Sequence, residues 1–210
     1  MKLVIATPSP FARKVRVVLR EKEIDFEEII DVPWNKDTIC TNFNPLGKIP
    51  VLLQEGKKPL FDSSIIVQHV ENMNKSPSMY PVSLKDVMLA KIIETTADGI
   101  CDALVLISLE NTRKEILRSK DWIQRQSVKI YNGIEYLSNE LGNEKYFVGE
   151  QFTIADVSAF SCLEYLDLRL PNFEWRSKHP NLEKYWQEHK NRRSFSETRP
   201  TVQAIEIIDN

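Results

Sequence analysis

Short apolar runs and amphipathic segments alternate over the first 75 residues of the chain. Residues 2–6 form an apolar run of the kind found in buried strands, and the sequence Thr-Pro-Ser-Pro interrupts it directly afterwards. From Phe11 onward, apolar residues recur at positions i, i+4, i+7 and i+8, which predicts an amphipathic helix. Pro10 suits the first turn of that helix, because its missing N–H would have no partner there.

Three more short strands and a second helix are predicted in the same part of the chain. The strands fall at 26–30, 51–53 and 59–61, and a short helical turn is expected near 37–41. Asp62, Ser63 and Ser64 then provide capping groups for a helix that continues to about Met73. We expect its inward side chains to be Ile65, Ile66, Val70 and Met73. This order of elements favours a small mixed sheet with helices packed on it.

The pattern changes after a polar, proline-containing stretch at 74–78. Beyond it no convincing strand follows, and apolar residues recur at helical spacing. The helices are expected around 89–104, 123–141 and 155–163, with short ones near 182–190 and 192–195. We therefore predict an α/β domain at 1–76, a linker at 77–84 and an all-helical domain at 85–210.

One helix start is marked sharply by Thr153 and Asp156. At this spacing the two residues can form a capping box, in which Asp156 reaches back to the N–H of Thr153. Asp stands here in place of the usual Glu or Gln. The role that we predict for this pair is structural, because a buried helix needs its first N–H donors satisfied.

Composition limits the classes of partner. The chain of 210 residues is 42% hydrophobic and 28% charged, with a formal net charge of -2. These values are ordinary for a globular protein and do not indicate nucleic acid or an anionic membrane as a partner. The N-terminal apolar run is too short for a signal peptide, and no stretch approaches the roughly 20 apolar residues of a membrane helix. We therefore expect a cytoplasmic protein.

The cysteines and histidines do not form recognisable clusters. The chain has three cysteines, Cys40, Cys101 and Cys162, and no C-x-x-C motif. The odd number and the missing motif argue against a disulfide framework and favour a reducing compartment. The three histidines lie far apart in the sequence, so we predict no metal site.

Four motifs, in order along the chain, carry a family resemblance. They are Ser9–Arg16, the Asn-Pro-Leu-Gly-Lys-Ile-Pro-Val-Leu segment at 44–52, the Asp62-Ser63 pair and the capping segment at 152–156. Each motif is weak alone, but the ordered set resembles the glutathione S-transferase superfamily over essentially the whole chain. Within it, the chain looks most similar to small bacterial transferases of the YibF-like kind. The resemblance implies a thioredoxin-like N-terminal domain that binds glutathione, followed by a helical-bundle domain.

The resemblance also implies a glutathione site. The Ile49–Pro50 bond is expected to be cis, so that the backbone of Ile49 pairs with the cysteinyl part of glutathione as an added strand would. Ser63 is expected to bind the γ-glutamyl carboxylate and Asp62 the ammonium group, although both also suit a simple helix cap. Lys48 either meets the anionic ligand or is an ordinary surface lysine.

Ser9 lies between the first strand and the first helix, where related families place Tyr, Ser or Cys. By resemblance, its hydroxyl donates to the glutathione sulfur and stabilises the thiolate; a turn residue before Pro10 is the alternative. Thr7 is a weaker substitute for this role. Serine cannot form the mixed disulfide that cysteine forms in reductases of the superfamily, which lowers the expectation of thiol-transfer chemistry.

A second substrate is implied as well. This would be a small electrophile, held near Phe11 and by Asp98 and Asp102, which lie one turn apart on a long helix. Surface contacts are the alternative role of the two aspartates. The resemblance further implies a homodimer, a detoxification role and no cofactor besides glutathione as co-substrate.

The basic first helix, with Arg13, Arg16 and Arg20, is interpreted as a solvated face with local ion pairs rather than as a dimer or ligand contact.

Two other functions stay open. A non-catalytic adaptor of the same fold would bind a protein partner, as stringent-starvation-type regulators do. A glutathione-dependent reductase, lyase or peroxidase is the other, and a reductase or lyase would need a cysteine near the thiol site. Cys40 is the nearest candidate for that cysteine, in a predicted loop.

Overall fold

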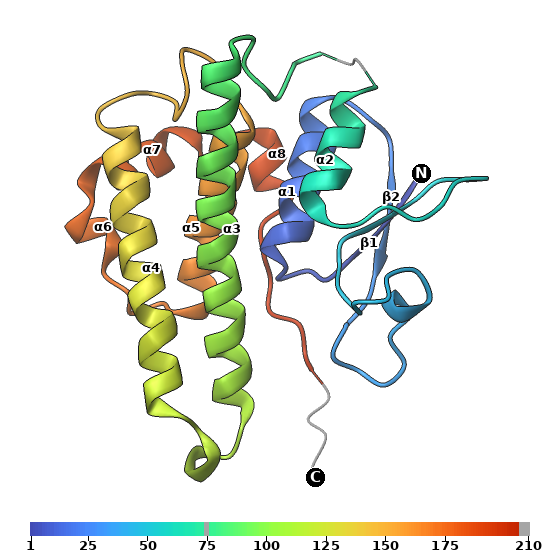
Figure 1. Cartoon of the computed structure of the whole chain (residues 1–210), viewed down its shortest axis with the longest axis vertical. Coiled ribbons are helices and arrows are strands. Elements are labelled where there is room, and N and C mark those ends of the chain that lie inside the picture. Colours follow the sequence, from blue (N-terminus) through green and yellow to red (C-terminus); the bar gives the residue numbers. More distant parts are fainter. Residues whose placement is uncertain (74–75, 206–210) are drawn as a thin grey trace. The chain divides into compact units, whose positions relative to one another are not determined.

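The computed structural model describes residues 1–73 and 76–205, which form two compact units (Figure 1). The first unit comprises Met1–Met79 and Arg193–Asn210, and the second comprises Tyr80–Arg192. This division differs from the predicted one, which assigned the whole of 85–210 to the helical domain. The C-terminal segment belongs to the first unit because buried arginines of that unit bind it, as described below. Residues 74–75, part of the polar stretch at 74–78, lie outside the described residues.

The sheet of the first unit has three strands in the order β2-β1-β3. Strand β1 (Lys2–Ile5) pairs in parallel with β2 (Glu27–Ile30) and antiparallel with β3 (Val51–Leu53). The mixed sheet is therefore confirmed. The predicted fourth strand is reduced to one bridge between Leu52 and Leu60. The next hydrogen-bonded pair on one side would need an N–H from Pro50, which has none, and on the other side the Gln54 carbonyl accepts from Lys57 in a turn.

Strand β1 is buried on both faces, which explains its unbroken apolar run. Leu3, Val4 and Ile5 are all 0% exposed. Val4 packs in a cluster with Cys40 and Val51. Because successive side chains alternate across a strand, Leu3 and Ile5 face the opposite side of the sheet.

Helices α1 (Pro10–Glu21) and α2 (Ser63–Glu71) pack against each other in the first unit. The unit also contains η1 (Cys40–Asn42) and α8 (Arg193–Ser196). The predicted inward face of α2 is right for Ile66 and Val70 and wrong for Ile65, which is 53% exposed. Val67 is buried instead, because positions 63, 66, 67 and 70 share one face at helical spacing.

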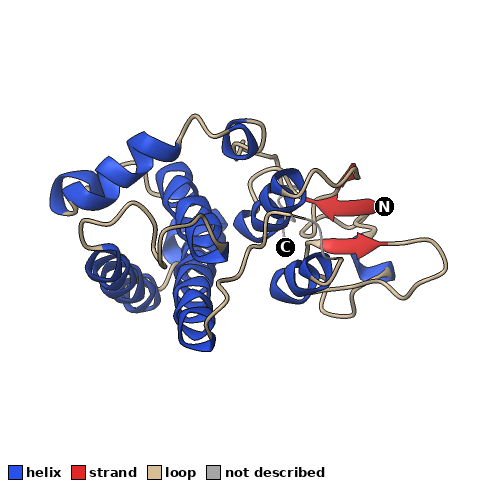
Figure 2. Cartoon of the chain, turned by 90° about the horizontal axis from the view of Figure 1, so that it is seen from above, coloured by secondary structure: helices blue, strands red, loops and turns tan. Residues whose placement is uncertain are grey.

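The second unit is built from helices within its described residues (Figure 2). Helix α3 (Leu84–Thr112) packs against both α4 (Lys120–Leu141) and α5 (Ile154–Arg169). At Gly133 of α4 a Cβ atom would lie 2.5 Å from Ile100, so glycine permits the close approach of α3 and α4. The smaller elements are η2 (Glu115–Leu117), α6 (Trp175–Lys178) and α7 (Pro180–His189); of these, η2 and α6 were not predicted. No helix in the described part of the chain is both long and apolar enough to span a membrane.

The predicted capping box forms at the start of α5, and its carboxylate is fully buried. Asp156 accepts hydrogen bonds from the backbone N–H of Thr153 at 2.8 Å and from the Thr153 hydroxyl at 3.1 Å. It also accepts from the N–H of Phe147 at 3.0 Å and from the Tyr185 hydroxyl at 3.3 Å. The one side chain therefore connects α5, α7 and the loop before α5.

Burial raises the pKa of Asp156 to about 6, although the hydrogen bonds from Thr153, Phe147 and Tyr185 oppose this shift. The folded-state pKa thus lies above the unfolded value of about 4. The folded protein holds this proton more tightly, so the stabilising contribution is fully present below about pH 4 and is lost as the pH rises through about 6.

We expect the Asp156→Asn variant to lose this pH dependence. Between pH 4 and 7, the unfolding free energy of the wild type should fall relative to that of the variant by on the order of 3 kcal/mol. Urea unfolding at several pH values measures the difference, and the comparison cancels the other titrating groups. A wild type that gains stability relative to the variant over this range would show that the hydrogen bonds outweigh burial.

Candidate functional site

Ser9 is the N-cap of α1, with its side chain at the positive end of the helix. Its hydroxyl oxygen accepts a hydrogen bond from the N–H of Ala12 at 3.1 Å. A hydroxyl that accepts in this way still carries a proton to donate. The partly buried Ser9 hydroxyl is therefore equipped both to cap the helix and to donate to an anion.

The segment before β3 is held by Asn44, which is buried. Its Nδ2 donates to the carbonyl of Lys48 at 2.7 Å, and its Oδ1 accepts from the N–H of Leu46 at 2.9 Å. Gly47 has φ +60 and donates its N–H to the Asn44 carbonyl at 2.9 Å. Sequence reasoning used Asn44 only as a motif residue and missed this role, although Asn-Pro-x-Gly is a turn signal that indicates such side-chain bonds.

The Ile49–Pro50 bond that follows is cis, as the resemblance implied. The Ile49 side chain packs on the cluster of Val4, Cys40 and Val51. Within the described residues, the Ile49 backbone enters no hydrogen bond with another backbone group. Its N–H and C=O are thus available to an extended peptide, and the neighbouring Lys48 is exposed.

Asp62 is the N-cap of α2 and accepts from Ser64 twice, from the N–H at 3.0 Å and from the hydroxyl at 2.6 Å. Burial disfavours the charged form of Asp62, but these hydrogen bonds and one from Ile65 outweigh it and lower the pKa. Asp62 is therefore an ionised acceptor at neutral pH. Ser63 is the first helical residue and is 2% exposed. The protein groups most accessible to a ligand here are therefore the Asp62 carboxylate and the first-turn N–H donors of α2.

The strand register brings these three segments to one edge of the sheet. Val4 lies opposite Val51, so the antiparallel pairing places the end of β1, which leads to Ser9, beside the start of β3, which follows Pro50. Leu60 pairs antiparallel with Leu52, so the chain runs back toward this same edge before it reaches Asp62. The edge thus collects a hydroxyl, an open backbone N–H and C=O, and a carboxylate at a helix start.

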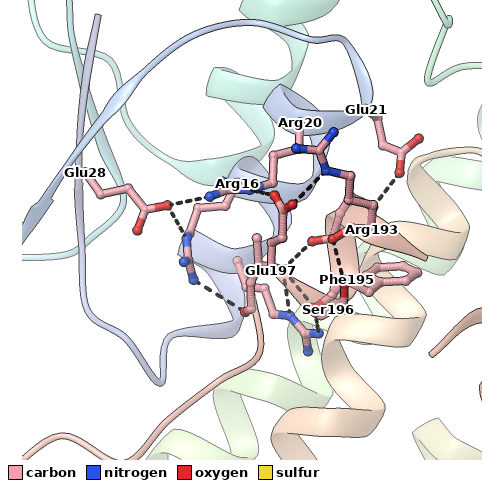
Figure 3. A network of polar contacts seen from close by, with 11 residues as sticks. Arg16, Arg20, Glu21, Glu28, Arg193, Phe195, Ser196 and Glu197 are labelled. Carbon is pink, nitrogen blue, oxygen red and sulfur yellow. Dashed lines mark hydrogen bonds and ion pairs between the residues drawn. The ribbon is translucent and has the colours of Figure 1, made fainter. Parts of the chain in front are cut away.

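The arginines of α1 bind the C-terminal segment of the chain, which corrects the prediction of a solvated face (Figure 3). Arg13 is 1% exposed; its Nη2 donates to the carbonyl of Phe195 at 3.1 Å and its Nε to the Thr198 hydroxyl at 3.3 Å. The expected ion pairs do form further along: Glu28 accepts from Arg16 at 2.8 Å and from Arg20 at 3.3 Å.

The segment is tied to α1 by further contacts. Arg20 pairs with Glu197 at 3.3 Å, and Arg16 donates to the carbonyl of Thr198 at 3.4 Å. Ser194 donates to Glu21. These contacts explain why Arg193–Ser196 belongs to the first unit.

Cys40 is unsuited to thiol chemistry. It is 0% exposed and packs in the core with Val4 and Val51. Burial, with a smaller contribution from the charge of Asp31, raises the pKa of its thiol. Cys101 and Cys162 are buried as well, which removes the support for a reductase reaction through Cys40.

The predicted second-substrate residues belong to different units. Phe11 is partly buried on α1 in the first unit, whereas Asp98 and Asp102 lie on α3 in the second. Both aspartates take part in polar interactions. Their role toward a substrate stays a prediction. Among the described residues, no group of three His, Cys, Asp or Glu side chains is placed to hold a metal ion.

Comparisons with known proteins identify the family. The family profile of the glutathione S-transferase N-terminal domain matches residues 8–73, and that of the C-terminal domain matches residues 120–187. The chain is 36% identical over 200 residues to an uncharacterized GST-like protein, YibF, of Escherichia coli (strain K12), covering 95% of this chain and 98% of the relative.

Solved structures are similar over nearly the whole chain. A glutathione S-transferase of Methylobacterium radiotolerans in complex with glutathione sulfonate is 39% identical, with a TM-score of 0.95, covering 100% of this chain and 98% of that one. One of Methylobacillus flagellatus with glutathione bound is 33% identical, with a TM-score of 0.91, covering 95% of this chain and 99% of that one.

Burial of the cysteines predicts that the native protein does not react with a thiol reagent. With Ellman's reagent at neutral pH, we expect no fast release of chromophore from the folded protein and the full signal of all 3 cysteines after denaturation. A thiol that reacts within minutes in the native state, and is lost in Cys40→Ser, would restore the reductase interpretation.

Asn44→Ala should destabilise the protein, because it removes two hydrogen bonds from a buried turn and leaves the Leu46 N–H and the Lys48 carbonyl without this partner. We expect a loss of about 2 kcal/mol in urea unfolding. The exposed Asn42 is the matched control, and Asn42→Ala should change stability by less than about 0.5 kcal/mol. Equal effects of the two substitutions would contradict the role of Asn44.

Proposed function

Because the chain belongs to the glutathione S-transferase family, we propose that it is a glutathione transferase, which binds glutathione, stabilises its thiolate and transfers it to a small electrophile. The observation that carries the proposal is the edge of the sheet at which Ser9, the open backbone of Ile49 and the start of α2 converge. Solved relatives hold glutathione or glutathione sulfonate, which supports this choice of ligand.

Each part of the tripeptide has a suitable partner at this edge. The cysteinyl backbone would pair with the N–H and C=O of Ile49, ahead of the cis bond to Pro50. The ammonium group would bind the ionised Asp62, and the γ-glutamyl carboxylate would bind the α2 N-terminus at Ser63. The exposed Lys48 would bind the glycyl carboxylate.

The Ser9 hydroxyl would donate to the sulfur and favour the thiolate. A free cysteine thiol has a pKa near 8.5, so only a few per cent is ionised at neutral pH. One charge-assisted hydrogen bond together with a helix N-terminus can lower that pKa by roughly one or two units, at about 1.4 kcal/mol for each unit. The larger thiolate fraction is then available to attack the electrophile.

The remaining assignments follow from the family. Phe11, Asp98 and Asp102 would contact the electrophile, and detoxification in the cytoplasm is the role that we propose. A homodimer is supported by an exposed apolar stripe on α3, where Leu84, Met88 and Ile92 are spaced by four residues and are 78%, 53% and 47% exposed.

Calorimetric titration with reduced glutathione and with an S-alkyl conjugate tests the proposal. We expect both to bind, the conjugate more tightly because its alkyl group would also occupy the second-substrate site. If neither binds, the transferase function is wrong, and an adaptor that binds a protein partner becomes the better interpretation.

Substitution of Ser9 tests the thiolate step, provided that its capping role is kept separate. Ser9→Ala removes both the cap and the donor, whereas Ser9→Gly removes the donor at a cost to the helix of only a few tenths of a kcal/mol. We expect the glycine variant to lose about a hundredfold in kcat while it still binds glutathione. Ser9→Thr, which retains a hydroxyl, should recover activity. An unchanged rate and thiol pKa in Ser9→Gly would remove Ser9 from the mechanism.

A further inference from the structure

The C-terminal segment is anchored to α1 as far as Thr198. Thr198 is 0% exposed, and it is bound by the Arg13 and Arg16 side chains. Beyond Thr198 the segment 199–205 has no regular secondary structure. Its course is instead determined by side-chain hydrogen bonds to the loop between β1 and α1, the loop that ends at Ser9.

Three hydrogen bonds connect this tail to the ends of β1 and β2. The Thr7 hydroxyl donates to the carbonyl of Thr201 at 3.2 Å. The Thr7 N–H donates to Oε1 of Gln203 at 3.2 Å, and Nε2 of Gln203 donates to the carbonyl of Asp31 at 3.3 Å. Only this orientation of the Gln203 amide matches both of its partners.

The two backbone groups that Gln203 connects would otherwise be the next pair in the sheet. The last bond of the parallel β1–β2 ladder runs from the Asp31 N–H to the Ile5 carbonyl at 2.7 Å. In an evenly spaced parallel ladder, the following bond would run from the Thr7 N–H to the Asp31 carbonyl. The Gln203 amide, which has one acceptor and a donor like a peptide group, is inserted between them.

The insertion has a consequence for the chain that follows Thr7. If Thr7 bonded directly to Asp31, β1 would continue alongside β2, and the loop that leads to Ser9 would begin later. With the Gln203 amide between them, the strands separate after Ile5, and Ser9 reaches the N-cap of α1 two residues beyond Thr7.

We propose that Gln203 is a positioning residue for Ser9, acting through Thr7. The proposal rests on the proposed function, since the position of Ser9 matters only if its hydroxyl donates to a thiolate. Gln203 contacts no reacting atom in this scheme. It sets the geometry of the loop that carries the hydroxyl, and small displacements of such a group reduce rates strongly.

The first test needs no glutathione. Amide hydrogen exchange at Thr7, measured by NMR, should be about tenfold faster in Gln203→Met, which keeps the side-chain length but removes both polar groups. Gln203→Glu keeps the acceptor for Thr7 and should accelerate exchange less. Val202→Ala is the control, because Val202 is the neighbouring residue and is 76% exposed. Exchange at Thr7 that is the same in Gln203→Met and the wild type would overturn the proposal.

The second test follows bound glutathione. Titration of thiolate absorbance near 240 nm should give a higher thiol pKa in Gln203→Met than in the wild type, and kcat should fall roughly tenfold with KM changed by less than about twofold. Faster exchange at Thr7 with an unchanged thiol pKa and kcat would mean that Gln203 is only structural, and would overturn the positioning role. If the wild type itself does not bind glutathione, the proposed function fails and the positioning role fails with it, while the exchange result still decides whether the Gln203 bridge exists.

Discussion

The pairing of β1 with both of its neighbours is the constraint on which the first unit depends. Parallel pairing with β2 and antiparallel pairing with β3 fix where each strand begins and ends, and so place Ser9, Ile49 and Asp62 at one edge. None of these residues is distinctive by itself. They form a candidate site because a hydroxyl, a backbone N–H and C=O without a strand partner, and a carboxylate lie at the same edge of the sheet. Each of these groups is held there by its own local structure.

Much of this could be predicted from local sequence because the relevant interactions are themselves local. The strand β1, the helix α1 and the capping box of Thr153 and Asp156 each depend on residues within a few positions of one another. Pro50 and its cis bond were also expected, although from the family motif rather than from local physics.

The errors and omissions have long-range causes. Arg13 was interpreted as solvated because a basic helix face usually is, but its partners Phe195 and Thr198 are more than 180 residues away in the sequence. Cys40 was a candidate nucleophile until packing placed it in the core. No sequence pattern indicates the role of Gln203. Its amide takes the place of a peptide group only because β1 and β2 separate beside it, and their separation depends on the folded structure.

The return of the C-terminal segment to α1 affects the order in which the two units can fold during synthesis. Residues 1–79 leave the ribosome first, yet α8 and Thr198 follow only after the whole second unit has been made. Until then two hydrogen-bond acceptors of the Arg13 guanidinium, the Phe195 carbonyl and the Thr198 hydroxyl, have not yet been made. The first unit is therefore a discontinuous domain, which reaches its final form only after the segment that begins at Arg193 has been made.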